Sequence, residues 1–190
     1  VCHDLISPVG AIVNGLEVLE EDKDEETRVF ALELIKKSAR QASAKLQFCR
    51  LAFGAAGSAG AQIETGDAEN VARGMIEDDK TKIAWNLPRE LKPKNQVKLL
   101  LNMLLIASGS IPRGGTLTVD PIEGAAGFRV TAAGLNARVT PATVELLTGK
   151  PAQTVDAHGV QPFYTALLAR DCGLAVTAVP EGESIVVTAR

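Results

Sequence analysis

A histidine close to the start of the chain stands among residues that can support nucleophilic chemistry. His3 is followed directly by Asp4, and a proline occurs at position 8. An exposed imidazole titrates near neutral pH, so its unprotonated form can attack an electrophile, and Asp4 could orient it or shuttle a proton. On spacing alone, His3 could equally be an ordinary surface histidine near one end of the chain.

The residues around His3 predict a helix with one apolar side and one polar side. Apolar residues recur in steps of four and three from Leu5 to Leu19, which is the spacing of a coiled-coil seam. At about 100° per residue, His3 falls on the opposite side, above small or polar residues that leave room for a second protein. These residues are Ser7, Gly10, Asn14 and Glu21. Pro8 lacks a backbone N–H, which frees a carbonyl one turn back and can bend the helix there.

A second apolar pattern predicts a longer helix that pairs with the first. It runs from Leu32 to Phe53 in alternating steps of three and four, so residues 1–53 predict a helical hairpin. Two helices alone bury two such seams poorly, whereas four helices bury them well. A homodimeric four-helix bundle is the natural completion, and packing of the hairpin on the rest of its own chain is the alternative.

The pattern changes after Gly54, where a small and uncharged stretch to Gly60 predicts a linker. We expect helices from Asp67 to about Asp79 and at 96–108, 140–147 and 160–172, with strands at 81–87, 116–119, 128–131, 174–179 and 185–188, and a turn at 88–93. Helices interleaved with mostly antiparallel strands indicate an α/β sandwich of one sheet and one helical layer. The expected domains are therefore 1–54 and 62–190.

The composition excludes several classes of function. The chain has 190 residues, of which 46% are hydrophobic, enough for aliphatic cores in two small domains. Its formal net charge of −3 and its lack of a large basic cluster argue against nucleic-acid binding. Cys2, Cys49 and Cys172 lack metal-ligand spacing, so we expect reduced thiols and no metal site. The sequence has neither a long apolar run nor a visible leader, so we expect a cytoplasmic protein without a membrane span. A helical pattern is already under way at Val1, so we also expect further residues upstream.

The stretch from His3 to Val9, His-Asp-Leu-x-x-Pro-Val, resembles the H-box of two-component histidine kinases, His-Glu/Asp-Leu-x-x-Pro-Leu. In that family the histidine opens a dimerisation and phosphotransfer hairpin, and an ATPase domain follows. The order and lengths of the two parts match over nearly the whole chain. The resemblance implies that His3 carries a phosphoryl group on a dimeric four-helix bundle, followed by an ATPase-like α/β sandwich of the Bergerat type.

The second part resembles the kinase ATPase domain but departs from it at the nucleotide-binding motifs. The N-box keeps Asn102, while Ile106 replaces the asparagine that holds magnesium. Ala132 replaces the G1-box aspartate that binds adenine, Asn136 replaces the following glycine, and Gln161 replaces a glycine of the G2 loop. Alanine offers adenine no acceptor, isoleucine offers magnesium no oxygen, and the altered loop offers phosphates no bare amides. The resemblance therefore implies a lost nucleotide site at these four positions.

A kinase-like dimer with a phosphorylatable histidine and no nucleotide site is similar to the ChpT-type histidine phosphotransferases of bacterial cell-cycle phosphorelays. This resemblance implies transfer from the receiver domain of a hybrid histidine kinase (CckA-like) to His3, and then to the aspartate of response regulators (CtrA-like and CpdR-like). No cofactor is expected on this chain, because the receiver should bring Mg²⁺. Receivers are expected to dock below His3. The expected docking residues are Ser7, Pro8, Gly10, Asn14, Leu46 and Arg50.

Other interpretations stay open. Leu46 could be a core residue, since it lies in the apolar seam, and His158 is expected on a surface loop. An active histidine kinase would bind ATP, and a non-enzymatic scaffold would bind receivers without carrying phosphate. A phosphatase is a further alternative, in which Ser7 would orient a water molecule.

Overall fold

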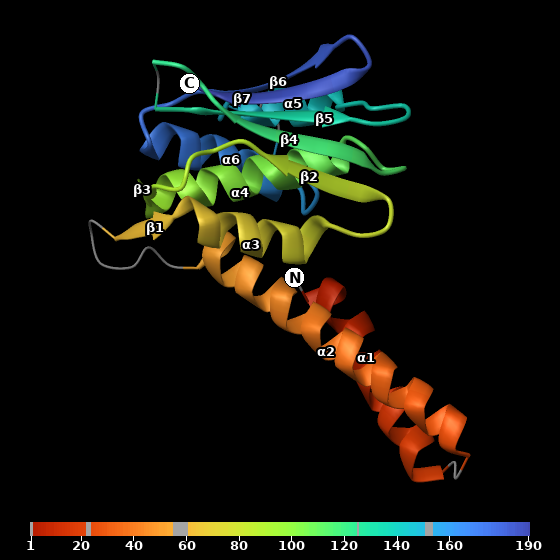
Figure 1. Cartoon of the computed structure of the whole chain (residues 1–190). Coiled ribbons are helices and arrows are strands. Elements are labelled where there is room, and N and C mark those ends of the chain that lie inside the picture. Colours follow the sequence, from red (N-terminus) through yellow and green to blue (C-terminus); the bar gives the residue numbers. More distant parts are fainter. Residues whose placement is uncertain (1, 22–23, 55–60, 125, 151–153) are drawn as a thin grey trace. The chain divides into compact units, whose positions relative to one another are not determined.

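The computed structural model describes residues 2–21, 24–54, 61–124, 126–150 and 154–190, and of residues 2–4 it describes the backbone alone. The chain separates into two compact units, Val1–Gly54 and Ala55–Arg190. The first unit is helical, and the second combines helices with strands (Figure 1). None of the described helices has the length and hydropathy that a bilayer-spanning segment needs.

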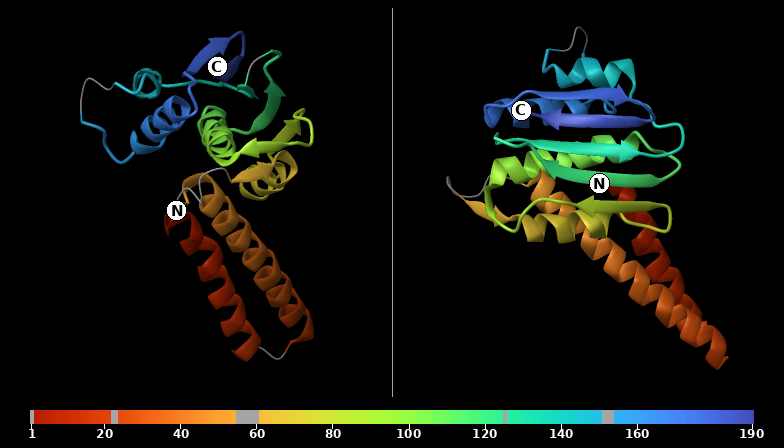
Figure 2. Two further views of the ribbon diagram at one scale, coloured as in Figure 1. Left: turned by 90° about the vertical axis from the view of Figure 1, so that its left-hand side faces the viewer. Right: turned by 45° about the horizontal axis from the view of Figure 1, so that its top comes forward.

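The first unit is the predicted helical hairpin. Its helices are α1 (Cys2–Glu21) and α2 (Glu25–Phe53), which lie side by side (Figures 1 and 2). Asp24 caps α2, because its carboxylate accepts a hydrogen bond of 2.9 Å from the backbone N–H of Thr27. That bond holds the pKa of Asp24 below its ordinary value. The helix ends where Gly54 donates its backbone N–H to the carbonyl of Arg50.

The contact line between the two helices differs from the predicted seam. Pro8 and Gly15 are the buried residues of the described part of α1, whereas Val9 and Leu16 are each 48% exposed. A Cβ atom on Gly15 would lie 2.7 Å from Cγ1 of Ile35, so α2 lies close against the α1 backbone at this glycine. The seam between the helices is therefore Leu5, Pro8, Ile12, Gly15 and Leu19. Small residues let the backbones approach and leave the larger aliphatic residues facing outward.

The second unit is built on a five-stranded mixed sheet in the order β2-β4-β5-β7-β6 (Figure 2). The strands are β2 (Thr81–Trp85), β4 (Gly115–Pro121), β5 (Phe128–Ala133), β7 (Ser184–Ala189) and β6 (Val176–Glu181). β2 and β4 are parallel, and the other neighbours are antiparallel. The predicted α/β sandwich with mostly antiparallel strands is confirmed.

One helical layer covers one face of this sheet (Figure 2). Its members are α3 (Thr65–Ile76), α4 (Lys94–Gly109), α5 (Pro141–Leu147) and α6 (Val160–Asp171). The central helix α4 is apolar on nearly all sides, as expected for a buried helix, and Leu99, Leu101 and Leu104 are fully buried. Every second residue of the inner strands faces this layer, which places the core between α4 and β4, β5 and β7.

Two local predictions were wrong. The helix predicted to begin with an Asp67 cap is α3, which starts at Thr65 and ends at Ile76 rather than near Asp79. Asp67 lies inside its first turn, where a negative charge is favourable. Residues 88–93, predicted as a turn, contain β3 (Leu91–Pro93), which pairs with β1 (Gln62–Glu64). Each of these strands has three residues, too few for an alternating pattern to emerge in the sequence.

Candidate functional site

His3 lies in the first turn of α1, and the helix continues without a break through Pro8. The side chains of His3 and Asp4 lie outside the described residues. Their proposed chemistry therefore stays a prediction. What the structure describes is the helical surface next to them.

That surface offers space on the predicted side of α1. Ser7 and Asn14 are exposed, and a Cβ atom on Gly10 would meet nothing within 4 Å. Pro8, in contrast, is buried against α2, so it shapes this surface from within the hairpin. A partner can thus approach the α1 backbone closely at Gly10.

The two docking residues predicted on α2 lie at a different height. Because Gly15 lies opposite Ala31 and Ile35 and the helices are antiparallel, Leu46 is level with the first turn of α1 and Arg50 lies beyond it. Leu46 is 54% exposed and Arg50 is also exposed. The part of α2 level with Ser7 and Asn14 comprises residues 34–41. Its exposed polar residues are Lys36, Lys37, Arg40 and Gln41, which the apolar periodicity did not single out.

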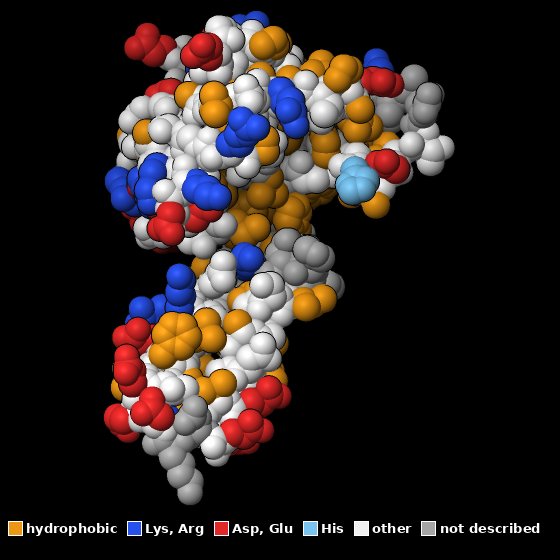
Figure 3. Space-filling view, turned by 90° about the vertical axis from the view of Figure 1, so that its right-hand side faces the viewer, with side chains coloured by type: hydrophobic (Ala, Val, Ile, Leu, Met, Phe, Trp, Pro, Cys, Tyr) orange, Lys and Arg blue, Asp and Glu red, His pale blue; other side chains and the backbone are white. Residues whose placement is uncertain are grey.

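Apolar rows remain exposed on both helices. On α1 the row is Ile6, Val9, Val13 and Leu16, and on α2 it is Leu32, Ala39, Leu46 and Phe53. The α1 row steps by three and four, and the α2 row steps by seven, as in the seam of a helical bundle. Hydrophobic side chains accordingly reach the surface of the hairpin between groups of acidic ones (Figure 3).

The four positions at which the resemblance implied a lost nucleotide site are distributed over several places in the second unit. Ile106 and Gln161 line one cavity of about 210 Å³. Asn136 lines another, of about 530 Å³, beside β5 and the β6–β7 turn. Ala132 is fully buried on the inner face of β5, opposite Leu117. Its methyl group belongs to the core and provides no acceptor for a base.

Gln161 joins α6 to α4 through hydrogen bonds. Its Nε2 donates to the backbone carbonyl of Asn102 at 3.0 Å and to Oγ1 of Thr165 at 3.2 Å. Thr165 in turn donates its hydroxyl to the carbonyl of Gln161 at 2.8 Å. Asn102 is fully buried, and its amide donates to the carbonyl of Lys98 at 2.8 Å. The asparagine that the kinase motif keeps is thus engaged inside the protein.

Asn136 has a backbone conformation that glycine adopts readily. Its φ is +58°, and among the described non-glycine residues no other φ is positive. Asparagine tolerates this left-handed conformation better than most residues, because its side chain can hydrogen-bond locally. The turn after β5 therefore takes a left-handed conformation at Asn136 without a glycine there.

A guanidinium and an imidazole border the cavity that contains Ile106 and Gln161. They belong to Arg138 and His158, both exposed, and neither was placed there by the sequence patterns. His158 was expected on a surface loop, and its exposure confirms this. Within the described ranges, no group of three or more His, Cys, Asp or Glu side chains is arranged to hold a metal ion.

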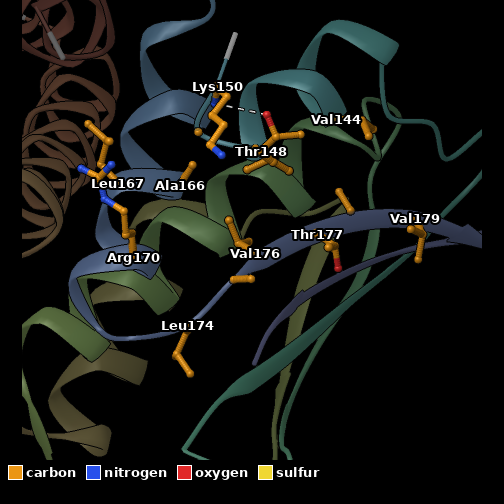
Figure 4. A pocket seen from close by; sticks show the side chains of 14 residues that line it. Val144, Thr148, Lys150, Ala166, Leu167, Arg170, Leu174, Val176, Thr177 and Val179 are labelled. Atoms are coloured by element: carbon orange, nitrogen blue, oxygen red, sulfur yellow. Dashed lines mark hydrogen bonds between the residues drawn. The ribbon is translucent and has the colours of Figure 1, made fainter.

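A further groove, of about 470 Å³, lies between α5, α6 and β6 (Figure 4). The sequence patterns gave no sign of it, because its walls come from three separate segments. Two cations, Lys150 and Arg170, are among its lining residues.

Comparisons with known proteins agree over the whole chain. Residues 65–184 match the family model of the histidine phosphotransferase C-terminal domain. The protein phosphotransferase ChpT of Brucella abortus (strain 2308) is 53% identical, and the alignment covers 100% of this chain and 90% of that relative. A solved structure of a bacterial phosphotransferase is 49% identical and matches with a TM-score of 0.80, over 100% of this chain and 91% of the solved one.

Proposed function

The chain belongs to the histidine phosphotransferase family, and from that premise we propose that it relays a phosphoryl group through His3. The donor is the phosphorylated aspartate in the receiver domain of a hybrid histidine kinase (CckA-like). The acceptors are the aspartates of response regulators (CtrA-like and CpdR-like). Its Brucella relative is a protein phosphotransferase, which supports the transfer role.

In each half of this reaction one bond is exchanged for another. The imidazole nitrogen of His3 attacks phosphorus, the P–O bond of the aspartyl phosphate breaks, and the carboxylate leaves. In the second half, the carboxylate of the next receiver attacks and the P–N bond breaks. Since the phosphoryl transition state is loose, positioning and charge neutralisation dominate its stabilisation. This chain supplies the imidazole, oriented by Asp4, and the receiver supplies Mg²⁺.

The hydrogen bond from Gln161 to Asn102 is the observation that carries the proposal of an ATP-independent relay. It ties the first turn of α6 to α4 at 3.0 Å, where the kinase motif requires a loop with free amides. Ile106 lines the same cavity and has no oxygen for Mg²⁺. We infer that the phosphoryl group comes from a protein and not from ATP.

The exposed apolar rows of the hairpin support a homodimer. The rows contain Ile6, Val9, Val13 and Leu16 on α1 and Leu32, Leu46 and Phe53 on α2, each at least 37% exposed. A second copy of the hairpin would present matching rows and bury both in a four-helix bundle. In that arrangement Leu46 contributes to the dimer core as well as lying level with His3.

Label transfer from a phosphorylated receiver domain tests the role of His3. We expect the full chain to take up label from the receiver and pass it to a second receiver. His3→Ala should abolish uptake, while His158→Ala, at the other histidine of the chain, should leave it unchanged. Equal uptake by the His3→Ala variant would rule out the proposed mechanism.

The same experiment separates the competing functions. A scaffold would bind the receiver without taking label, and a phosphatase would release inorganic phosphate without labelling the chain. An active kinase would bind ATP, so we expect calorimetric titration with ATP and Mg²⁺ to give no binding heat. Micromolar ATP binding would contradict the relay proposal.

Light scattering after gel filtration tests the dimer. The double variant Val9→Lys and Val13→Lys places charges in the exposed α1 row and should give the mass of a monomer. Val18→Lys, a similar change off this row, should leave the dimer intact. A dimer that survives the double variant would show that the pairing surface lies elsewhere.

A further inference from the structure

The groove between α5, α6 and β6 has an apolar floor (Figure 4). The floor consists of Leu147, Ala166, Val176 and Ala178, none of which is more than 7% exposed. Val144, which is 39% exposed, continues this apolar surface to the solvent. The volume of about 470 Å³ lies within the range of roughly 300–1,000 Å³ that is usual for small-molecule clefts, which are mainly apolar with a few polar groups.

The charges in the groove are of one sign. Lys150 and Arg170 are its charged lining residues, both are exposed, and neither side chain makes an ion pair with a described residue. They come from different walls, since Lys150 follows α5 and Arg170 lies in the last turn of α6. The chain as a whole has a net charge of −3, so this pair of cations contrasts with the rest of the molecule. Two unpaired cations beside an apolar floor suit a ligand with an anionic head.

The cations and the exposed apolar side chain lie at different places along the groove. Figure 4 shows Lys150 and Arg170 toward one side of the groove and Val144 toward the other. The order of the chain agrees, because Val144 lies within α5 and Lys150 follows the end of that helix at Leu147. A ligand that lies along the groove therefore places an anionic head near the cations and an apolar tail over the floor.

We propose that this groove binds a free single-chain carboxylate, such as a medium-chain fatty acid. The carboxylate lies near Lys150 and Arg170, and the hydrocarbon chain covers the apolar floor. Exposed ion pairs contribute little free energy, so burial of the chain provides most of the affinity and the two cations select an anionic head. The groove belongs to the second unit and His3 to the first, so this binding is a function separate from the proposed phosphotransfer.

Equilibrium dialysis of the full chain against radiolabelled straight-chain carboxylates, from hexanoate to tetradecanoate and below their micelle concentrations, tests the proposal. We expect the affinity to rise about fourfold for each added methylene group, which corresponds to about 0.8 kcal/mol, and to level off once the chain fills the groove. Val144→Glu should weaken the binding of dodecanoate at least tenfold. Val160→Glu, the same change at an exposed valine of α6 outside the groove, should not.

The methyl ester of dodecanoate tests the role of the cations. The ester should bind the unaltered chain about fivefold more weakly than the carboxylate, because two exposed ion pairs together contribute about 1 kcal/mol. Lys150→Gln combined with Arg170→Gln should lower the affinity for the carboxylate by the same factor and leave the affinity for the ester unchanged. Arg113→Gln, at an exposed arginine outside the groove, should alter neither affinity. Circular dichroism should be unchanged in all these variants, since the replaced side chains are exposed.

Three results with these ligands would overturn the proposal. The first is that no carboxylate of the series binds. The second is an affinity that keeps rising with chain length and is unchanged in the Val144→Glu variant, which would show association with exposed apolar surface elsewhere. The third is equal affinity for the carboxylate and its ester. Binding to vesicles of phosphatidylglycerol without binding of free carboxylates would also overturn it, and would assign the groove to a membrane surface.

Discussion

Replacement of Gln161 by methionine removes the link between α6 and α4 and keeps the length of the side chain. Two hydrogen bonds are lost, at 3.0 Å to the Asn102 carbonyl and at 3.2 Å to the Thr165 hydroxyl. A neutral hydrogen bond contributes about 1 kcal/mol net, so the pair amounts to about 2 kcal/mol. A third approach, of 3.4 Å to the Asn102 side chain, is too long to add much. We therefore expect the free energy of unfolding to fall by about 2 kcal/mol.

Urea unfolding followed by the fluorescence of Trp85 measures this loss. Trp85 is the single tryptophan of the chain and lies in β2, so its signal reports on the second unit. Gln62→Met is the matched control, because Gln62 is an exposed glutamine in β1 of the same unit and its replacement should cost less than about 0.5 kcal/mol. A Gln161 variant as stable as this control would refute the reasoning. The Gln161→Gly variant should still bind no ATP, because Ile106 offers magnesium no oxygen and Ala132 offers adenine no acceptor.

Three further substitutions test the packing that the structure describes. Gly15→Ala places a Cβ atom 2.7 Å from Ile35 and should destabilise the hairpin by about 1 kcal/mol, although alanine has the better helix propensity. Urea unfolding followed by circular dichroism measures this loss, and an unchanged unfolding midpoint would contradict the close contact. Arg73→Met removes hydrogen bonds to two glutamates and to the carbonyl of Ile83, and should cost about 2 kcal/mol by tryptophan fluorescence. Ala132→Asp buries an unpaired carboxylate and should cost at least about 3 kcal/mol without creating ATP binding; tight ATP binding by this variant would show that one aspartate suffices.

The sequence predicted the elements whose periodicity is long and regular. Both hairpin helices and the main helices and strands of the second unit were expected within a few residues of their observed bounds. The contact surface between the hairpin helices was not predicted, because the buried residues of the described part of α1 are Pro8 and Gly15. Neither is strongly hydrophobic, so an apolar pattern favours their larger neighbours Val9 and Leu16 instead. Two helix backbones approach closely where the side chains between them are small, and a pattern of hydrophobic residues does not reveal such positions.

The resemblance also predicted altered nucleotide motifs, but not the contacts that these residues make. Gln161 was predicted to stand in place of a glycine, whereas its hydrogen bond to Asn102 joins residues 59 positions apart. Asn136 was likewise predicted to be a substitution, and its left-handed φ of +58° emerges only from the fold. A motif comparison shows which ligands are absent, while the contacts that take their place depend on tertiary structure.

The hydrogen bonds of Gln161 restrict movement of the first turn of α6 in the second unit. A nucleotide-binding domain has to move the loop before this helix in order to admit and release its ligand. Here the first turn of α6 is held to a fully buried residue of α4, so that movement would cost the same hydrogen bonds that stabilise the unit. A relay that receives its phosphoryl group from a protein does not need such movement. The hydrogen bonds of Gln161 are therefore compatible with the proposed transfer of a phosphoryl group between proteins.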